Sequence, residues 1–173
     1  MIILFSLDLW AMMAPLLTPR WQQAWANLLP TEAPMLKTAL DDIVMPPSAK
    51  LLGWRLLDSR PWDGWLKVGF DGRAEFCNPA GFIQGGILSA MLDDTMGPAV
   101  FVTSEGRYYA TTISLTVNFI APAKPGPLTA EAQVIQIGKS VAFMEGKLIG
   151  DDGTVLATAS TTARLVEAAR ALR

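Results

Sequence analysis

A glycine pair followed by an apolar run constrains the fold of this chain more than any other feature. Gly85 and Gly86 lead directly into Ile87-Leu88-Ser89-Ala90-Met91-Leu92-Asp93-Asp94. A rotation of about 100° per residue places the large side chains on one broad arc of a helix, namely Ile87, Leu88, Met91, Leu92, Thr95 and Met96. The small or acidic residues Ser89, Asp93 and Gly97 recur at i, i+4 and i+8 on the other side. Pro98 predicts that the helix ends near Ala99.

Two interpretations of this helix stay open at this level. It is either an ordinary amphipathic helix with solvated aspartates or a helix that lines a cleft. A solvated face usually carries Lys, Glu or Arg, whereas this one carries Ser, Ala and Gly, which favours the cleft. A helix N-terminus attracts anions, and a carboxylate about two turns further on is costly to bury, so the arrangement is typical of a catalytic cleft.

Strand-like runs surround the helix. We expect strands over residues 51–57, 65–70, 109–120, 128–138, 141–149 and 154–166, separated by turns at residues 122–127, 138–139 and 151–153. Residues 129–137 alternate most clearly between apolar and polar side chains, which indicates an antiparallel sheet with one wet face. The sequence therefore predicts an α+β fold, in which an antiparallel sheet wraps around one long central helix.

Residues 1–47 form a predicted N-terminal helical extension, and residues 48–173 form the main domain. Thr18-Pro19 is a good start for a helix that puts Trp21 and Trp25 on one face, and Pro30 ends it. We expect a second short helix over residues 31–40 and an extended connection through residues 45–47, which read Met-Pro-Pro.

The first thirteen residues are apolar, but they lack a basic start and carry Asp8. They are too short for a confident membrane span, so we expect a soluble, cytoplasmic protein. The segment is either a docking helix or translated upstream sequence, with Met12 or Met13 as the biological start.

The absence of histidine excludes several kinds of chemistry. The 173 residues include no His and one cysteine, so Ser-His-Asp and Cys-His triads and histidine-bearing zinc sites cannot form. We expect no metal. Cys77 cannot form an internal disulfide, and without a histidine to activate it a nucleophilic role is disfavoured. A net charge of -2 and scattered basic residues argue against nucleic acid as a partner.

Residues 78–94 and 112–123 together resemble the phenylacetate-pathway (PaaI-like) type of hotdog-fold acyl-CoA thioesterase. The resemblance covers residues 51–166 and rests on Asn78, the glycine pair and Asp93 at family spacing. One position departs from the pattern, because the family usually has His where this chain has Gln84.

The resemblance implies a role for each candidate catalytic residue. Asp93, seven residues after the second glycine, is the nucleophile or general base, and Asp94 is a surface or interface charge. Gly85 presents a backbone N–H to the developing oxyanion, although the pair could simply allow a tight turn. Asn78 binds the thioester carbonyl or water, or else it opens a turn. Thr112 approaches the cleft from the neighbouring subunit.

Further positions are expected to bind substrate: Gln84, Gly86, Ser89 and Thr111, where Thr111 is also the fallback for Thr112. Gln84 can hydrogen-bond as a neutral imidazole does but cannot carry a proton, so it orients the loop or the carbonyl. Ser114 stands where many relatives carry an acid. Lys124, Lys139 and Arg164 are candidates for binding the phosphates of coenzyme A.

The expected function is hydrolysis of an acyl-CoA thioester to free acid and coenzyme A. The expected assembly is a homodimer or a dimer of dimers, and no cofactor is needed beyond the coenzyme A of the substrate. Two alternatives remain. One is a non-catalytic acyl-CoA or acyl-group binding protein, which Gln84 favours, and the other is an interaction module that docks a partner through its Trp-rich N-terminal segment.

Overall fold

The computed structural model describes residues 37–172. The predicted helix with Trp21 and Trp25, the thirteen-residue leader and most of the second short helix lie outside this range. The described elements are the helices η2 (Ala39–Asp42), α3 (Pro47–Leu52), η3 (Pro61–Asp63), η4 (Ala74–Phe76), α4 (Gly85–Thr103) and α5 (Ala168–Ala171), and the strands β1 (Arg55–Arg60), β2 (Trp65–Gly72), β3 (Tyr108–Phe119), β4 (Gly126–Ile137), β5 (Val141–Gly150) and β6 (Val155–Glu167). No helix among residues 37–172 combines the length and apolar character needed to cross a membrane.

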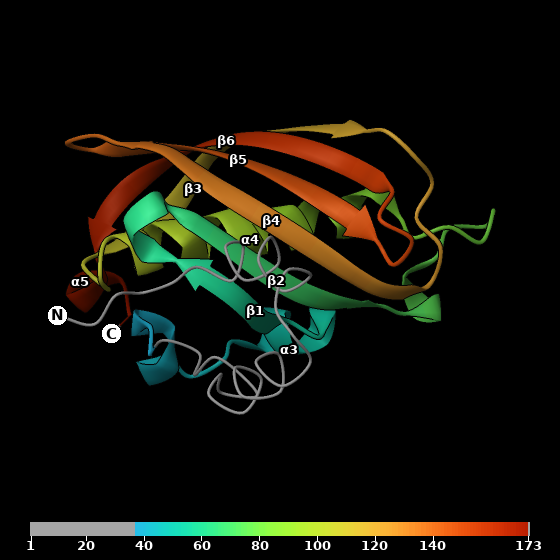
Figure 1. Cartoon of the computed structure of the whole chain (residues 1–173), viewed down its shortest axis with the longest axis horizontal. Helices are drawn as coiled ribbons and strands as arrows, with labels where there is room; N and C mark the ends of the chain where they lie inside the picture. The colour runs from blue at the N-terminus through green and yellow to red at the C-terminus, as the bar shows by residue number, and fades with distance from the viewer. Residues whose placement is uncertain (1–36, 173) are drawn as a thin grey trace, which may run out of the picture. The chain divides into compact units, whose positions relative to one another are not determined.

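The six strands form one antiparallel sheet in the order β1-β2-β4-β5-β6-β3, and α4 lies along its concave side (Figure 1). α4 contacts β2 through β6, which confirms the predicted α+β architecture of a sheet wrapped around one central helix. The predicted burial arc of the helix is also confirmed at five of its six positions, because Leu88, Met91, Leu92, Thr95 and Met96 are buried. The sixth, Ile87, is partly buried. β3 is the last strand at its end of the sheet.

Small side chains on the strands let the helix approach the sheet closely. Buried alanines line the concave face on three neighbouring strands: Ala130 and Ala132 of β4, Ala142 of β5, and Ala157, Ala159 and Ala163 of β6. A Cβ atom on Gly146 of β5 would lie 3.2 Å from the side chain of Met96 in α4. The large helix residues therefore fill the space that the small strand residues leave.

The outer face of the sheet is polar, as the alternation predicted. Glu131 of β4 lies between Lys67 of β2 and Lys147 of β5, with Nζ to carboxylate oxygen distances of 3.4 Å and 3.0 Å. Its chain neighbours Ala130 and Ala132 are buried on the concave side. The alternation lapses after the bulge between Val134 and Gln136.

The predicted strand over residues 51–57 is wrong in its first half. Residues Pro47–Leu52 form α3, and β1 begins only at Arg55. Pro47 occupies the first turn, where its missing N–H costs nothing, and Gly53 ends the helix with a left-handed φ of 69°. The two prolines, which predicted an extended connection, also start a helix. Residues 39–42 form a 3₁₀ helix where the end of the second short helix was expected.

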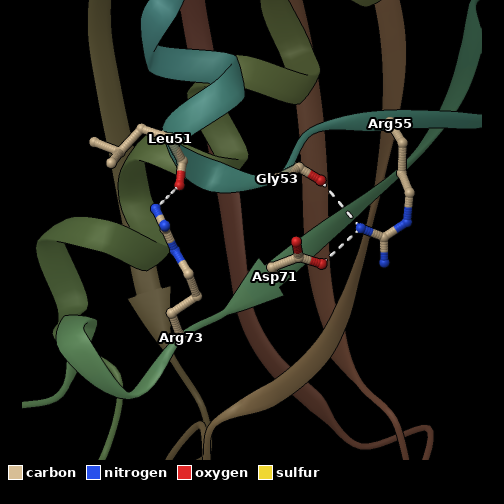
Figure 2. A network of polar contacts seen from close by, with 5 residues as sticks. All are labelled: Leu51, Gly53, Arg55, Asp71 and Arg73. Carbon is tan, nitrogen blue, oxygen red and sulfur yellow. Dashed lines mark hydrogen bonds and ion pairs between the residues drawn. The ribbon is translucent and has the colours of Figure 1, made fainter.

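Polar contacts fasten α3 to the first two strands (Figure 2). The Arg55 guanidinium donates to the Asp71 carboxylate at 2.7 Å and to the Gly53 carbonyl at 3.1 Å. The Arg73 guanidinium donates to the carbonyl of Leu51. α3 is thereby joined at its C-terminal end to both β1 and β2.

The prediction that Pro98 ends the central helix is also wrong, since α4 continues to Thr103. Pro98 has no N–H to donate to the carbonyl of Asp94, four residues earlier. The indole Nε1 of Trp54 donates to that carbonyl at 2.9 Å instead. A side chain from the link between α3 and β1 thus replaces the missing helix hydrogen bond, and the helix tolerates the proline.

We predict that Trp54→Phe lowers the free energy of unfolding by about 1–3 kcal/mol, because the carbonyl of Asp94 loses the donor that takes the place of the missing N–H of Pro98. In a Pro98→Ala background the backbone N–H gained at position 98 can serve that carbonyl, so the same Trp54 substitution should cost less. Urea unfolding of the wild type, the two single variants and the double variant gives the coupling energy between positions 54 and 98. Equal costs in both backgrounds would contradict this account of the helix.

Candidate active site

A cavity of about 230 Å³ lies beside the second half of α4. Its polar end is formed by Asp93 and Asp94 of α4 and Thr112 of β3. The other described lining residues are mostly apolar: Leu40, Ile43, Met45, Pro46, Ala49, Trp54, Gly97, Pro98, Phe101, Tyr109, Ala110 and Leu172. The part of the small and acidic side that carries Asp93 and Gly97 therefore lines a cleft, which favours the cleft interpretation, whereas Ser89 is not among the described lining residues.

Asp93 and Thr112 are brought together directly. The Thr112 hydroxyl donates to Asp93 Oδ1 at 2.8 Å, although 19 residues separate them in the chain. The sequence predicted that Thr112 reaches the cleft from a neighbouring subunit, but this contact is within one chain. Thr111, the fallback, is not among the described lining residues. A bulge between Thr112 and Ser114 interrupts the pairing of β3 with β6 there.

Asp94 shares the cavity with Asp93. The sequence treated it as a surface or interface charge, but its side chain is partly buried, and its Oδ2 is buried without a hydrogen-bond partner among residues 37–172. Burial raises the pKa of Asp94, and the neighbouring charge of Asp93 raises it further. The two neighbouring carboxyl groups thus differ in their hydrogen bonding, because Asp93 accepts a hydrogen bond from Thr112 whereas Asp94 Oδ2 has no partner in the described region.

The start of α4 offers backbone donors. The N–H groups of Ile87 and Leu88 both bond to the carbonyl of Gln84, whereas those of Gly85 and Gly86 have no acceptor within the described part of the chain. Gln84 is the N-cap residue, is exposed, and makes no side-chain capping bond. Free amides at a helix N-terminus favour a negative charge.

Other predicted site residues lie around the same helix start. A Cβ on Gly85 would lie 3.0 Å from the Phe119 ring, while one on Gly86 would meet nothing within 4 Å. Ser89 donates its hydroxyl to the Gly85 carbonyl at 2.9 Å, so this group is occupied within the helix. Asn78 Oδ1 accepts from the backbone N–H groups of Ala80 at 2.9 Å and Phe82 at 3.3 Å. Its amide oxygen is therefore used by the loop, as the turn interpretation expected.

The predicted residues fall into two groups that one chain does not join. Asp93 and Thr112 line the cavity, while Gly85, Gly86 and Gln84 lie at the helix start. Eight residues separate Gly85 from Asp93, which corresponds to about 12 Å along a helix. A single thioester carbonyl cannot contact both groups in one chain. Lys124, Lys139 and Arg164 are exposed and line no part of the cavity, so their roles remain predictions.

Sequence reasoning missed the apolar wall of the cavity. Leu40 and Ile43 were assigned to the N-terminal extension and Trp54 to a strand, and neither Ala49 nor Trp54 had a role in the site. The sequence did indicate that a donor is needed here, because a proline inside a helix leaves the carbonyl four residues earlier without its usual N–H partner. No pattern in the sequence names that donor.

We predict that Asp94→Asn stabilises the chain increasingly as the pH rises. The pKa of Asp94 is raised from its ordinary value of 3.8, which means that the folded chain favours the protonated carboxyl. The contribution of Asp94 to wild-type stability is therefore fully present below pH 3.8 and is lost as the pH rises through the pKa of the folded state. Asparagine mimics the protonated form at every pH. Thermal unfolding between about pH 4 and pH 8 should show a growing difference in Tm. Asp151→Asn in an exposed turn is the control, and a difference that shrinks with pH would refute the assignment.

The chain has relatives in sequence and structure. The profile of the thioesterase superfamily matches residues 80–157. A candidate esterase of Saccharolobus solfataricus is 31% identical over 87 residues, and the match spans 50% of this chain and 61% of that protein. A crystal structure of a candidate thioesterase from Ralstonia eutropha, described as phenylacetic acid degradation-related, is 32% identical with a TM-score of 0.69, and the alignment covers 73% of this chain and 95% of the other.

The PaaI protein from the phenylacetic acid degradation operon of E. coli has the same fold. It superposes with a TM-score of 0.61 at 22% identity, over 68% of this chain and 86% of that protein.

Proposed function

Because the chain belongs to the thioesterase superfamily, in its PaaI-like hotdog type, we propose that it hydrolyses acyl-CoA thioesters to free acid and coenzyme A. The observation that carries this proposal is the carboxylate of Asp93, which lies at the polar end of an apolar cavity and is hydrogen-bonded by Thr112. A carboxylate that faces apolar space is suited to attack, or to activate water against, an acyl group held there.

Asp93 acts in one of two ways. As a general base it takes a proton from water while the water oxygen attacks the carbonyl carbon, the C–S bond breaks, and the leaving sulfur receives a proton. As a nucleophile it attacks the carbonyl carbon itself, the C–S bond breaks, and coenzyme A leaves as a thiolate that takes up a proton. The mixed anhydride that remains on Asp93 is hydrolysed by water to the free acid and the regenerated carboxylate. In both routes the Thr112 hydroxyl donates a hydrogen bond to Asp93 Oδ1, which orients the carboxylate and leaves Oδ2 as the oxygen that reacts.

The oxyanion is stabilised at the start of α4. The N–H groups of Gly85 and Gly86, which have no acceptor among residues 37–172, and the positive end of the helix dipole favour negative charge on the carbonyl oxygen. The Asn78 side-chain amide has its oxygen engaged by the loop, which leaves Nδ2 to donate to substrate or water. The exposed Gln84 orients the carbonyl or the loop, Ser89 supports the helix start, and Thr111 lies beside the site on β3.

We propose that the complete site is shared by two copies of the chain. About 12 Å of helix separates Gly85 from Asp93, so the oxyanion donors and the carboxylate at one carbonyl must come from different subunits. β3 supplies a surface for association, because it is an edge strand with exposed apolar side chains at Ile113 (62% exposed) and Phe119 (55% exposed). The expected assembly is a homodimer or a dimer of dimers.

The reaction as proposed uses only protein groups and the coenzyme A of the substrate, so neither a metal nor another cofactor is required. Lys124, Lys139 and Arg164 are the proposed partners of the coenzyme A phosphates. We also propose a cytoplasmic location, which the single Cys77 supports because it can form no internal disulfide.

A non-catalytic acyl-CoA binding protein is the second candidate. It is favoured by Gln84, which stands where the family usually has a histidine and cannot transfer a proton. A steady-state assay on a panel of acyl-CoAs with detection of the released thiol separates the two, because a binding protein releases none.

We predict that Asp93→Ala lowers kcat by at least about 10²-fold, the scale of a lost acid-base group, while acyl-CoA affinity changes little. The reason is that the carboxylate supplies chemistry and the apolar walls supply most of the binding. Asp151→Ala removes an exposed carboxylate outside the cavity and is the control. Near wild-type turnover of a folded Asp93→Ala chain would refute the mechanism.

The shared site predicts complementation between two inactive chains. Gly85→Val crowds the oxyanion donors and the Phe119 ring, and Asp93→Ala removes the carboxylate. A mixed dimer contains one site with both wild-type groups, so the co-expressed pair should be much more active than either variant alone. A mixture of Asp93→Ala with Asp93→Ser is the control and should stay inactive. An active monomer in sedimentation, or mixed dimers without recovery, would contradict the shared site.

A further inference from the structure

The cavity beside Asp93 has an apolar wall that comes from outside the wrapped sheet. Leu40, Ile43 and Met45 lie before α3, and Ala49 lies within it. On the other side the cavity is bounded by Gly97 and Phe101 of α4. The carboxylate of Asp93 therefore faces a space with one polar end and otherwise mostly apolar walls.

The wall is held at a defined position relative to Asp93. Trp54 follows α3, lines the cavity, and donates its indole N–H to the carbonyl of Asp94 at 2.9 Å. Its backbone N–H bonds to the carbonyl of Ala49 at 2.9 Å. Arg73 also bonds to the carbonyl of Leu51 at the end of α3 (Figure 2). The segment that forms the wall is thus joined both to α4 and to Arg73, the residue that directly follows β2.

Resting on the proposed function, we propose that this cavity is the acyl pocket, and that its wall limits the substrate to short and medium acyl groups of up to about eight carbons. A cavity of about 150 Å³ accommodates a six-carbon benzene ring, so a space of about 230 Å³ holds roughly eight or nine carbon atoms. Longer chains gain nothing from the pocket because their additional methylenes remain in water.

The sharpest test measures affinity and does not need turnover. S-alkyl-coenzyme A thioethers, which cannot be hydrolysed, are titrated into the full-length protein by calorimetry. The Kd should fall about fourfold for each added methylene, from ethyl to octyl, because each buried methylene contributes a constant increment. It should change little from octyl to hexadecyl. A Kd that is independent of chain length, one that keeps falling to hexadecyl, or no binding at all would overturn the proposal.

Gly97 allows the pocket to be filled from the helix side. A Cβ built on Gly97 meets nothing within 4 Å, so Gly97→Leu should occupy the cavity without a clash from other elements. It should raise the Kd for the octyl thioether by at least about tenfold and leave that for the ethyl thioether nearly unchanged, because about three buried methylenes are displaced. Gly97→Ala is the control for any strain of a side chain before Pro98, and it should keep most of the octyl preference.

The opposite wall provides a matched pair. Ile43 lines the cavity, whereas its neighbour Val44 is 87% exposed and does not. Ile43→Ala should reduce the ratio of octyl to ethyl affinity by at least about fourfold, and Val44→Ala should leave the ratio unchanged. Equal effects of the two substitutions would overturn the role of the wall.

These outcomes separate the pocket from the reaction. Chain-length-dependent affinity without thiol release from any acyl-CoA would retain the acyl pocket and refute the thioesterase. Thiol release without an effect of Gly97→Leu or Ile43→Ala on chain-length preference would retain the thioesterase and refute the pocket.

Discussion

The hydrogen bond from Trp54 to the carbonyl of Asp94 connects the helix, the wall of the cavity and the candidate site. Pro98 removes the donor that the helix itself would supply at this carbonyl, one residue beyond Asp93. The replacement comes from the link between α3 and β1, so that link stabilises the helix where it continues through Pro98. The same contact positions the segment that forms one wall of the cavity. The missing helix hydrogen bond at Pro98 therefore lies next to Asp93, the proposed catalytic residue.

The packing of α4 against the sheet determines where chemistry can occur. Alanines and Gly146 on the concave face admit Met91, Leu92 and Met96, and these contacts bury one side of the helix. The side with Ser89, Asp93 and Gly97 does not pack against these residues of the sheet, and Asp93 and Gly97 line the cavity next to the edge strand β3. Since a helix extends about 1.5 Å per residue, its start and its carboxylate lie too far apart to contact one carbonyl within a single chain.

The two adjacent carboxyl groups illustrate how environment separates similar residues. Asp93 has the Thr112 hydroxyl on one oxygen, whereas Asp94 has a buried oxygen without a partner in the described region and a raised pKa caused by burial and by Asp93. Because Asp93 and Asp94 are consecutive, their side chains leave the helix in directions about 100° apart. That rotation did not indicate that both side chains line the same cavity, and the roles of the two carboxyl groups remain predictions.

Periodicity in the sequence by itself determined the central helix, five of the six strands and the polar outer face, because alternation and helical spacing are local properties that burial then enforces. The motif also singled out Asp93 and Thr112, which the structure brings to 2.8 Å, whereas the roles of Asn78 and Gln84 remain predictions. Tertiary structure alone decided that α3 replaces the first half of a strand, that α4 passes Pro98, and that residues 40–54 form an apolar wall beside Asp93. These features depend on contacts between residues far apart in the chain, such as Trp54 with Asp94, and no local pattern specifies which distant donor satisfies a given carbonyl.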